Sequence, residues 1–199
     1  MESLETMQPI VDREAGDFSR TESDESEKWF VMRDLKRINS KLPAHRMLKN
    51  KGFEVFTPLK WHLINRAGKK IREEIPFIQD LLFVKSSRSK LDPVVENTPT
   101  LQYRFFKGGG YREPMIVSDT RMNIFINAVR STDRPAYYSP EELTPEVCGR
   151  TVRIIGGPLN GYEGPLLKVK GSKVKRVIVE LPMLLATCVE VNPEFIQLL

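Results

Sequence analysis

The sequence is poor in the residues that build metal centres, disulfide frameworks and many catalytic sites. It has two cysteines, Cys148 and Cys188, which lie far apart and lack the paired spacing of a zinc site. It has two histidines, His45 and His62, and neither stands in an arrangement with serine, cysteine or acidic residues that indicates catalysis. The glycines at 108–110 match neither a phosphate-binding loop nor a dinucleotide fingerprint. We therefore expect reduced thiols, no metal, no cofactor and no enzymatic activity.

Long hydrophobic runs are also missing. No apolar stretch approaches the ~18–20 residues that cross a bilayer. The N-terminus lacks the basic segment followed by an apolar stretch that marks a signal peptide. These absences favour a cytoplasmic protein. The apolar residues that are present, 40% of the chain with ten Phe, five Tyr and two Trp, suffice for one medium domain or two small ones.

Charge is divided unevenly along the chain. Residues 1–27 hold nine acidic side chains against two basic ones, a net charge of −7, so the remainder carries +12 because the whole chain carries +5. The acidic segment has few large apolar groups, which predicts a disordered tail. The basic remainder favours a polyanionic partner such as nucleic acid, with general solubility as the alternative interpretation.

The N-terminal half alternates strand-like and helix-like patterns. The clearest helix starts at Ser118, a good N-cap residue, and carries an apolar stripe from Met122 through Phe125 and Ile126 to Val129. Such alternation predicts an α/β sandwich over residues 28–130. The expected strands lie at 28–32, 53–56, 81–84 and 101–106, an extended hairpin at 59–77 with its tip at 65–70, and helices between Pro43 and Gly52, at 88–97 and at 118–130.

The composition changes after residue 130. Residues 131–147 contain Pro135, Pro140 and Pro145 among polar residues and are predicted to be a linker. Residues 148–199 show no helical period, and turns rich in Gly, Pro, Asn and Ser separate short apolar runs. This pattern is typical of a small SH3-like β-barrel. Its expected strands lie at 151–155, 163–169, 176–181, 186–191 and 195–198.

The most informative segment runs from Gly149 to Gly164, with the sequence GRTVRIIGGPLNGYEG. It predicts a strand, a tight turn and a returning strand. Gly161 and Gly164 are expected to supply a backbone angle or a close approach that a Cβ would obstruct. The spacing of its apolar, Gly and Pro positions resembles the KOW motif, which occurs in NusG-type transcription factors and in some ribosomal proteins.

The N-terminal half resembles the N-terminal domain of the NusG family, the NGN domain. Trp29-Phe30-Val31 resembles its opening strand, and residues 97–101 and 114–119 resemble two further stretches. Residues 75–84 resemble the family's aromatic-Pro-Gly-aromatic strand, with Gln79-Asp80 where Pro-Gly is usual. The resemblance covers residues 28–199 and implies an α+β protein, an NGN sandwich with a ferredoxin-like sheet followed by a KOW barrel. The departure at 79–80 favours a specialised paralogue similar to the UpxY-type antiterminators of capsular-polysaccharide operons.

The resemblance also implies partners. NGN domains dock on the clamp helices of the largest RNA polymerase subunit, suppress pausing or termination and face non-template DNA, and KOW barrels recruit Rho or a ribosomal protein. We expect a monomer in the bacterial cytoplasm. By position, the candidate polymerase-binding residues are Ile78, Leu81, Phe83, Leu101 and Phe105. The candidate DNA-binding residues are Lys36, Arg37, Lys41, His45, Arg46, Lys49, Arg66, Lys69, Lys70 and Arg72, and the candidate partner-binding residues of the barrel are Met183, Leu184 and Thr187.

Each of these assignments has an alternative. Successive strand residues point to opposite faces, so the polymerase candidates are equally interpretable as core. The basic residues are also compatible with a solvated face, and the barrel loop with a cover over the barrel's open end. For the whole protein, an RNA-binding or ribosome-associated KOW protein and a housekeeping NusG with a Rho-linked role in termination stay open.

Overall fold

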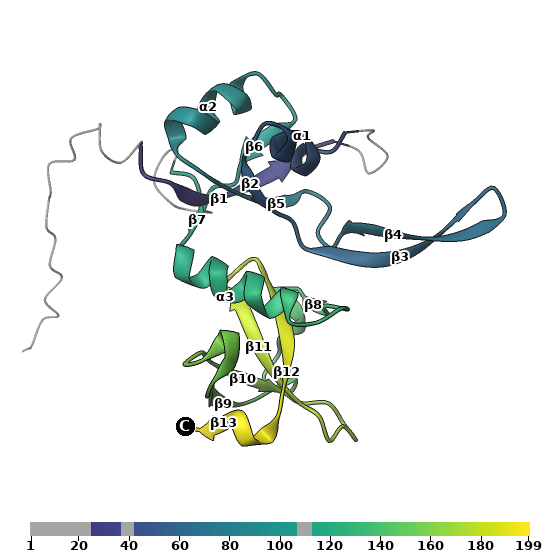
Figure 1. Cartoon of the computed structure of the whole chain (residues 1–199), viewed down its shortest axis with the longest axis vertical. Coiled ribbons are helices and arrows are strands. Elements are labelled where there is room, and N and C mark those ends of the chain that lie inside the picture. The colour runs from purple at the N-terminus through teal and green to yellow at the C-terminus, as the bar shows by residue number, and fades with distance from the viewer. Residues whose placement is uncertain (1–24, 37–41, 107–112) are drawn as a thin grey trace, which may run out of the picture.

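The computed structural model describes residues 25–36, 42–106 and 113–199 (Figure 1). Most of the acidic N-terminal segment, the glycines at 108–110, and Arg37 and Lys41 of the predicted DNA-binding set lie outside the described residues.

A five-stranded antiparallel sheet organises the N-terminal half. The central strand β1 (Lys28–Asp34) pairs on one side with β5 (Leu81–Ser86) and on the other with β6 (Leu101–Tyr103) and β7 (Ile116–Val117). β2 (Glu54–Phe56) extends the sheet beyond β5. β1 and β5 are apolar throughout their centres because both faces of this part of the sheet are covered.

Three helices cover the two faces of this sheet. The helices α1 (Ala44–Asn50) and α2 (Arg88–Glu96) pack on one face, where Phe30, Leu82 and Leu101 belong to one core cluster. The helix α3 (Asp119–Arg130) lies on the other face (Figure 1), where Phe125 packs against the ring of Phe56 at 6.0 Å. The predicted cap of α3 is confirmed, since the Ser118 hydroxyl accepts a hydrogen bond from the Arg121 N–H at 3.4 Å.

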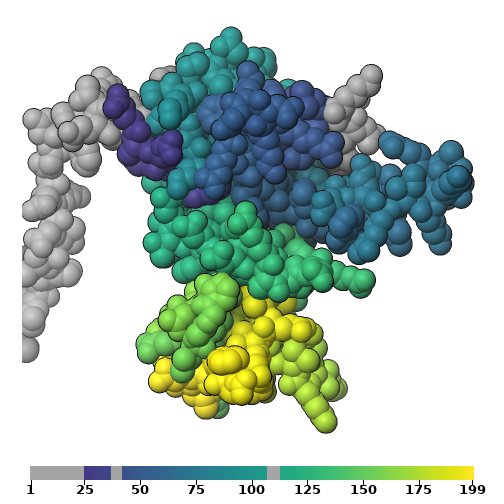
Figure 2. Space-filling view, viewed as in Figure 1, coloured from purple at the N-terminus to yellow at the C-terminus, as the bar shows by residue number. Residues whose placement is uncertain are grey.

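The predicted hairpin forms a separate two-stranded ribbon of β3 (Leu59–Arg66) and β4 (Lys69–Pro76). Its eight paired positions end in a two-residue turn at Ala67 and Gly68, both with positive φ (51° and 77°), as in the tight turns that join twisted strands. The ribbon extends well beyond the sheet and helices (Figure 2). An isolated ribbon is marginally stable by itself, so its length and exposure favour a role in contacting a partner.

The C-terminal half is a six-stranded β-barrel sheet with the order β13-β9-β10-β11-β12-β8. Gly161 has φ +80°, and a Cβ on Gly164 would lie 2.5 Å from the backbone oxygen of Ile178. Both glycines therefore have the role expected of the KOW segment. The elements are β8 (Tyr137–Tyr138), β9 (Cys148–Ile154), β10 (Glu163–Leu167), β11 (Lys175–Leu181), β12 (Leu185–Val191), β13 (Ile196–Leu198) and the 3-10 turns η1 (Pro140–Glu142), η2 (Gly157–Leu159) and η3 (Pro193–Phe195).

The segment predicted as a linker contributes to the barrel. β8 lies within it and pairs with β12, and the buried Tyr137 side chain stacks against Phe77 with ring centroids 5.3 Å apart. Helix α3 also packs against β11, β12 and η2, so its apolar residues join one core cluster that includes Trp29 of the sheet and Val177 of the barrel. The two halves therefore share buried surface through α3 (Figure 1).

Candidate functional site

Three of the five residues predicted to bind polymerase lie in the hydrophobic core. Leu81, Phe83 and Leu101 are 1%, 0% and 1% exposed. The Phe83 ring packs 6.2 Å from that of Phe56 beneath α3, and Leu101 packs beneath the other two helices. These three side chains are buried in this arrangement, because helices cover both faces of the sheet rather than one.

The other two candidates lie along one end of the sheet. Ile78 is half-buried and Phe105 is 48% exposed. Between them, the Asp80 carboxylate accepts a hydrogen bond from Arg33 Nε at 2.9 Å and lies 3.9 Å from Arg104. The rim from Ile78 to Phe105 therefore joins apolar side chains to a group of paired charges.

Asp80 was noted in the sequence only as a departure from the family's Pro-Gly pair. In the structure its backbone oxygen accepts a hydrogen bond from the Asp34 N–H at 2.9 Å, while its side chain pairs with Arg33. The departure thus replaces a turn-forming pair with an anchor between the β4–β5 connection and β1. The sequence showed the unusual acidic residue at position 80 but did not identify Arg33 as its partner.

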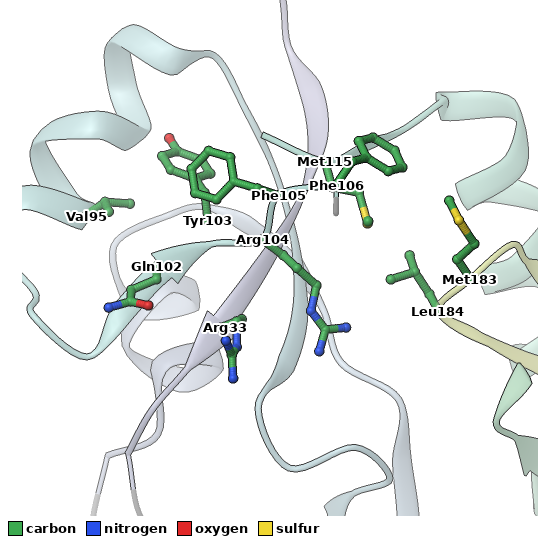
Figure 3. A pocket seen from close by; sticks show the side chains of 10 residues that line it. All are labelled: Arg33, Val95, Gln102, Tyr103, Arg104, Phe105, Phe106, Met115, Met183 and Leu184. Carbon is green, nitrogen blue, oxygen red and sulfur yellow. The ribbon is translucent and has the colours of Figure 1, made fainter. Parts of the chain in front are cut away.

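An apolar hollow adjoins this rim (Figure 3). Its volume is about 830 Å³, and it lies between the end of the sheet and the barrel loop that joins β11 to β12. Phe105, Phe106 and Met183 are 48%, 42% and 68% exposed, so the hollow presents large apolar side chains to solvent. Its lining comprises Arg33, Val95, Gln102, Tyr103, Arg104, Phe105, Phe106, Met115, Met183 and Leu184.

Of the three barrel residues predicted to bind a partner, one is exposed and two are buried. Met183 has positive φ (64°) and projects into solvent, whereas Leu184 and Thr187 are 5% and 0% exposed. The Thr187 hydroxyl donates to the backbone oxygen of Ala136 at 2.9 Å, next to β8. Leu184 and Thr187 are therefore buried in this arrangement, and of the three only Met183 offers a broad exposed surface.

The basic residues after β1 gather beside the base of the ribbon. Lys36, His45, Arg46 and Lys49 line a second hollow of about 310 Å³. Its opposite wall comes from the ribbon base and the turn that follows it, including Glu73, Glu74 and Gln79. Asp34 lines the same hollow, so three carboxylates lie there with the three cations. The sequence predicted the cations but not this juxtaposition, which depends on how the ribbon leaves the sheet.

His45 lies at the centre of this basic group. Partial burial and the neighbouring charges of Arg46 and Lys49 lower the pKa of His45 below its ordinary value, and the carboxylate of Asp34 opposes this shift. At neutral pH the imidazole is therefore uncharged and offers one donor and one acceptor. This pattern suits a polar contact with a base edge better than a purely ionic one.

The ribbon combines cations with exposed apolar side chains. Arg66, Lys69 and Lys70 are exposed around the tip, and the Arg72 guanidinium stacks 4.6 Å from the centre of the Trp61 ring. Trp61, Leu63 and Ile71 are 45%, 65% and 41% exposed. No acidic residue occurs in the sequence from 59 to 72, so the outer ribbon is uniformly basic.

No helix in the described ranges is long and apolar enough to cross a membrane. Residues 25–36, 42–106 and 113–199 contain no group of three or more His, Cys, Asp or Glu side chains placed to hold a metal ion.

Comparisons with known proteins agree with the resemblance found in the sequence. Residues 27–126 match the family model described as transcription termination factor NusG. Comparison with curated proteins gives no match. Among solved structures, the chain is similar to one described as "Domain interaction in Thermotoga maritima NusG", with 15% sequence identity and a TM-score of 0.45 over 87% of this chain and 98% of that one.

Proposed function

This chain belongs to the NusG family of transcription elongation and termination factors, whose members interact with RNA polymerase, and on that premise we propose that it binds the clamp helices of the polymerase and suppresses pausing and termination. The observation that carries this proposal is the exposed apolar hollow beside the rim from Ile78 to Phe105. A monomer with large exposed apolar side chains around a concavity has the properties of a docking site.

The docking surface proposed here comprises Ile78, Phe105 and Phe106. Transfer of three such side chains from water into an interface contributes about 1.5–3 kcal/mol each before the costs of association. Arg33 and Arg104 lie beside the apolar surface and share one carboxylate, that of Asp80, so they leave a net positive charge that is complementary to acidic groups on a helical partner. Suppression of pausing then requires only that the factor bind closed polymerase more tightly than open polymerase.

The basic residues beside the ribbon base and the outer ribbon are proposed to contact the non-template DNA strand. Lys36, Arg46 and Lys49 supply phosphate contacts, and the uncharged His45 supplies a contact that depends on the base. The ribbon of β3 and β4, which carries Arg66, Lys69, Lys70 and Arg72, extends this surface away from the sheet (Figure 2). Arg37 and Lys41, which lie outside the described residues, complete the proposed set.

The departure at Gln79-Asp80 and the basic ribbon favour a specialised factor over a general one. We propose that it acts on particular operons, such as capsular-polysaccharide loci, as UpxY-type antiterminators do. The barrel, through Met183, is proposed to recruit a second protein such as Rho or a small-subunit ribosomal protein. Chromatin occupancy confined to a few operons supports the specialised role, whereas occupancy across most transcribed genes indicates the housekeeping role.

The polymerase proposal is tested with a reconstituted elongation complex. Phe105→Ser should weaken binding of the full chain by about tenfold, equivalent to about 1.4 kcal/mol. Phe195→Ser is the matched control, because Phe195 is 47% exposed against 48% for Phe105 but lies on the barrel at η3. Equal affinities of the two variants and the unchanged protein would remove Phe105 from the interface. Read-through of a terminator, measured by run-off transcription, should fall in parallel with binding.

The DNA proposal is tested through salt dependence. Replacing Lys69 and Lys70 with glutamine removes two charges at the ribbon tip. If both contact phosphates of a single strand, the slope of log affinity against log salt should become less steep by about 1.4. The control pair is Lys51, which directly follows α1, and Lys90, which lies within α2. Both lysines are exposed. A slope that changes equally in both pairs would show only a general effect of net charge.

A further inference from the structure

The hairpin that joins β10 to β11 carries positive charge that the proposed polymerase and DNA contacts do not use. Residues 168–176 read KVKGSKVKR and include five basic side chains. No acidic residue occurs in the sequence between Glu163 and Glu180. We name residues 168–176 the basic hairpin.

The basic hairpin has a defined backbone. The Ser172 N–H donates to the Val169 oxygen at 3.1 Å, which closes a tight turn around Gly171 at φ +77°. The Val174 N–H donates to the Ser172 hydroxyl at 3.2 Å, and Arg176 reaches the same hydroxyl at 3.5 Å. The lysines are therefore displayed from a fixed turn at the end of two barrel strands.

Neighbouring acids pair with one of the five basic side chains, Arg176, and leave the four lysines without an acidic partner. The carboxylate of Glu190 pairs with Arg176 at 2.6 Å, and that of Glu163 accepts a hydrogen bond from Arg153 Nε at 2.8 Å. Lys170, Lys173 and Lys175 are exposed, and their side chains form no hydrogen bond or ion pair with any residue in the described part of the chain. Lys168 donates to the backbone oxygen of Pro145 at 3.2 Å and so keeps its charge uncompensated.

The basic hairpin also lies away from the buried contacts of the barrel. It extends from the end of the barrel opposite α3, seen as the yellow-green projection at the lower right of Figure 1 and Figure 2. Val169 and Val174, which alternate with the lysines, are 44% and 45% exposed. The surface therefore combines four exposed lysines with two solvent-facing apolar side chains.

We propose that the basic hairpin binds single-stranded RNA, with its lysines on the phosphates and its valines against unstacked bases. Exposed valines favour a single strand over a duplex, because a duplex stacks its bases inside and presents mainly phosphates to a projecting turn. The choice of RNA over single-stranded DNA rests on the proposed function, since a factor bound to elongating polymerase lies near the emerging transcript. This contact is separate from the proposed DNA surface, which belongs to the N-terminal half.

The experiment measures the affinity of the full chain for a fluorescein-labelled 20-nucleotide oligouridylate, by fluorescence anisotropy between about 50 and 200 mM salt. The test variant replaces Lys170, Lys173 and Lys175 with glutamine. If these lysines make three phosphate contacts, affinity at low salt should fall by about tenfold and the salt slope should become less steep by about 2. Because all three side chains are exposed, the melting temperature should stay unchanged, which separates loss of contact from loss of fold.

The matched control removes three positive charges from the other half of the chain, by replacing Lys28, Lys51 and Lys90 with glutamine. It should keep most of the RNA affinity. Equal losses in the two triple variants, or unchanged affinity in the test variant, would overturn the proposal. If the test variant lost more affinity for a DNA duplex or for oligothymidylate than for the RNA, the assignment to RNA would be overturned.

The same variants separate this inference from the proposed function. The oligouridylate assay contains no polymerase, so its result does not depend on docking. The test variant should bind the elongation complex through the N-terminal half but crosslink less to its transcript. Loss of ribosome binding with unchanged oligouridylate affinity would assign the lysines to another partner and overturn the proposal.

Discussion

The variant Phe83→Ala tests whether Phe83 belongs to the core of the N-terminal half or to its docking surface. Phe83 is 0% exposed and packs against Phe56, which in turn meets Phe125 of α3. Truncation of a buried phenylalanine costs about 3–5 kcal/mol, because the transfer energy is lost and a cavity remains. Domains are stable by only about 5–15 kcal/mol, so this change removes a large share of the total.

The expected consequence is a lower melting temperature. For a chain of this length, each kcal/mol shifts the midpoint by about 2–4 °C, so Phe83→Ala should lower it by about 6–20 °C. Circular dichroism measures the midpoint, and polymerase affinity is measured well below it. Phe105→Ala is the control, because truncation of an exposed side chain should change stability by no more than about 0.5 kcal/mol. A Phe83→Ala protein with an unchanged midpoint but weak polymerase binding would refute the assignment of Phe83 to the core.

Two further predictions concern the KOW segment and His45. Gly164→Ala should lower the melting temperature more than Gly161→Ala. A Cβ at position 164 would lie 2.5 Å from the Ile178 oxygen, whereas a Cβ at position 161 would meet no neighbouring atom and would be opposed by the positive φ alone. Equal melting temperatures of the two variants would contradict this. The pKa of His45, followed by NMR, should lie below its ordinary value and rise in Arg46→Gln. Since the folded pKa is lowered, the stability from His45 is complete above pH of about 6.5 and is lost as pH falls toward the folded pKa. An unfolding free energy with the same pH dependence in His45→Gln would contradict this.

Local sequence patterns predicted most of the elements. The stripe from Met122 to Val129 predicted α3, and Gly52, with φ +85° just past the end of α1, marked a helix terminus. The glycines of the KOW segment predicted a turn and a close approach. These signals work because helix periodicity, capping and positive φ depend on residues near one another in the chain.

Long-range contacts decided which candidate site residues reach the surface. Leu81 and Phe83 lie on a strand whose one face is covered by a helix almost forty positions later in the sequence, so no local pattern distinguishes a docking face from a covered one. Thr187 is buried because the predicted linker returns as β8 and pairs with β12. The ion pair between Asp80 and Arg33 depends on the sheet, which places these two residues side by side although they are far apart in the sequence.

The sequence by itself therefore determined most of the strands and helices, the basic character of the N-terminal half and barrel, and the resemblance to a family defined by those patterns. The tertiary structure decided that the sheet is covered on both faces, that Phe105 and Met183 border one hollow, and that the basic residues of α1 meet carboxylates of the ribbon. The physical reason is that backbone preferences are set by neighbours in the chain, whereas burial and charge pairing are set by neighbours in space.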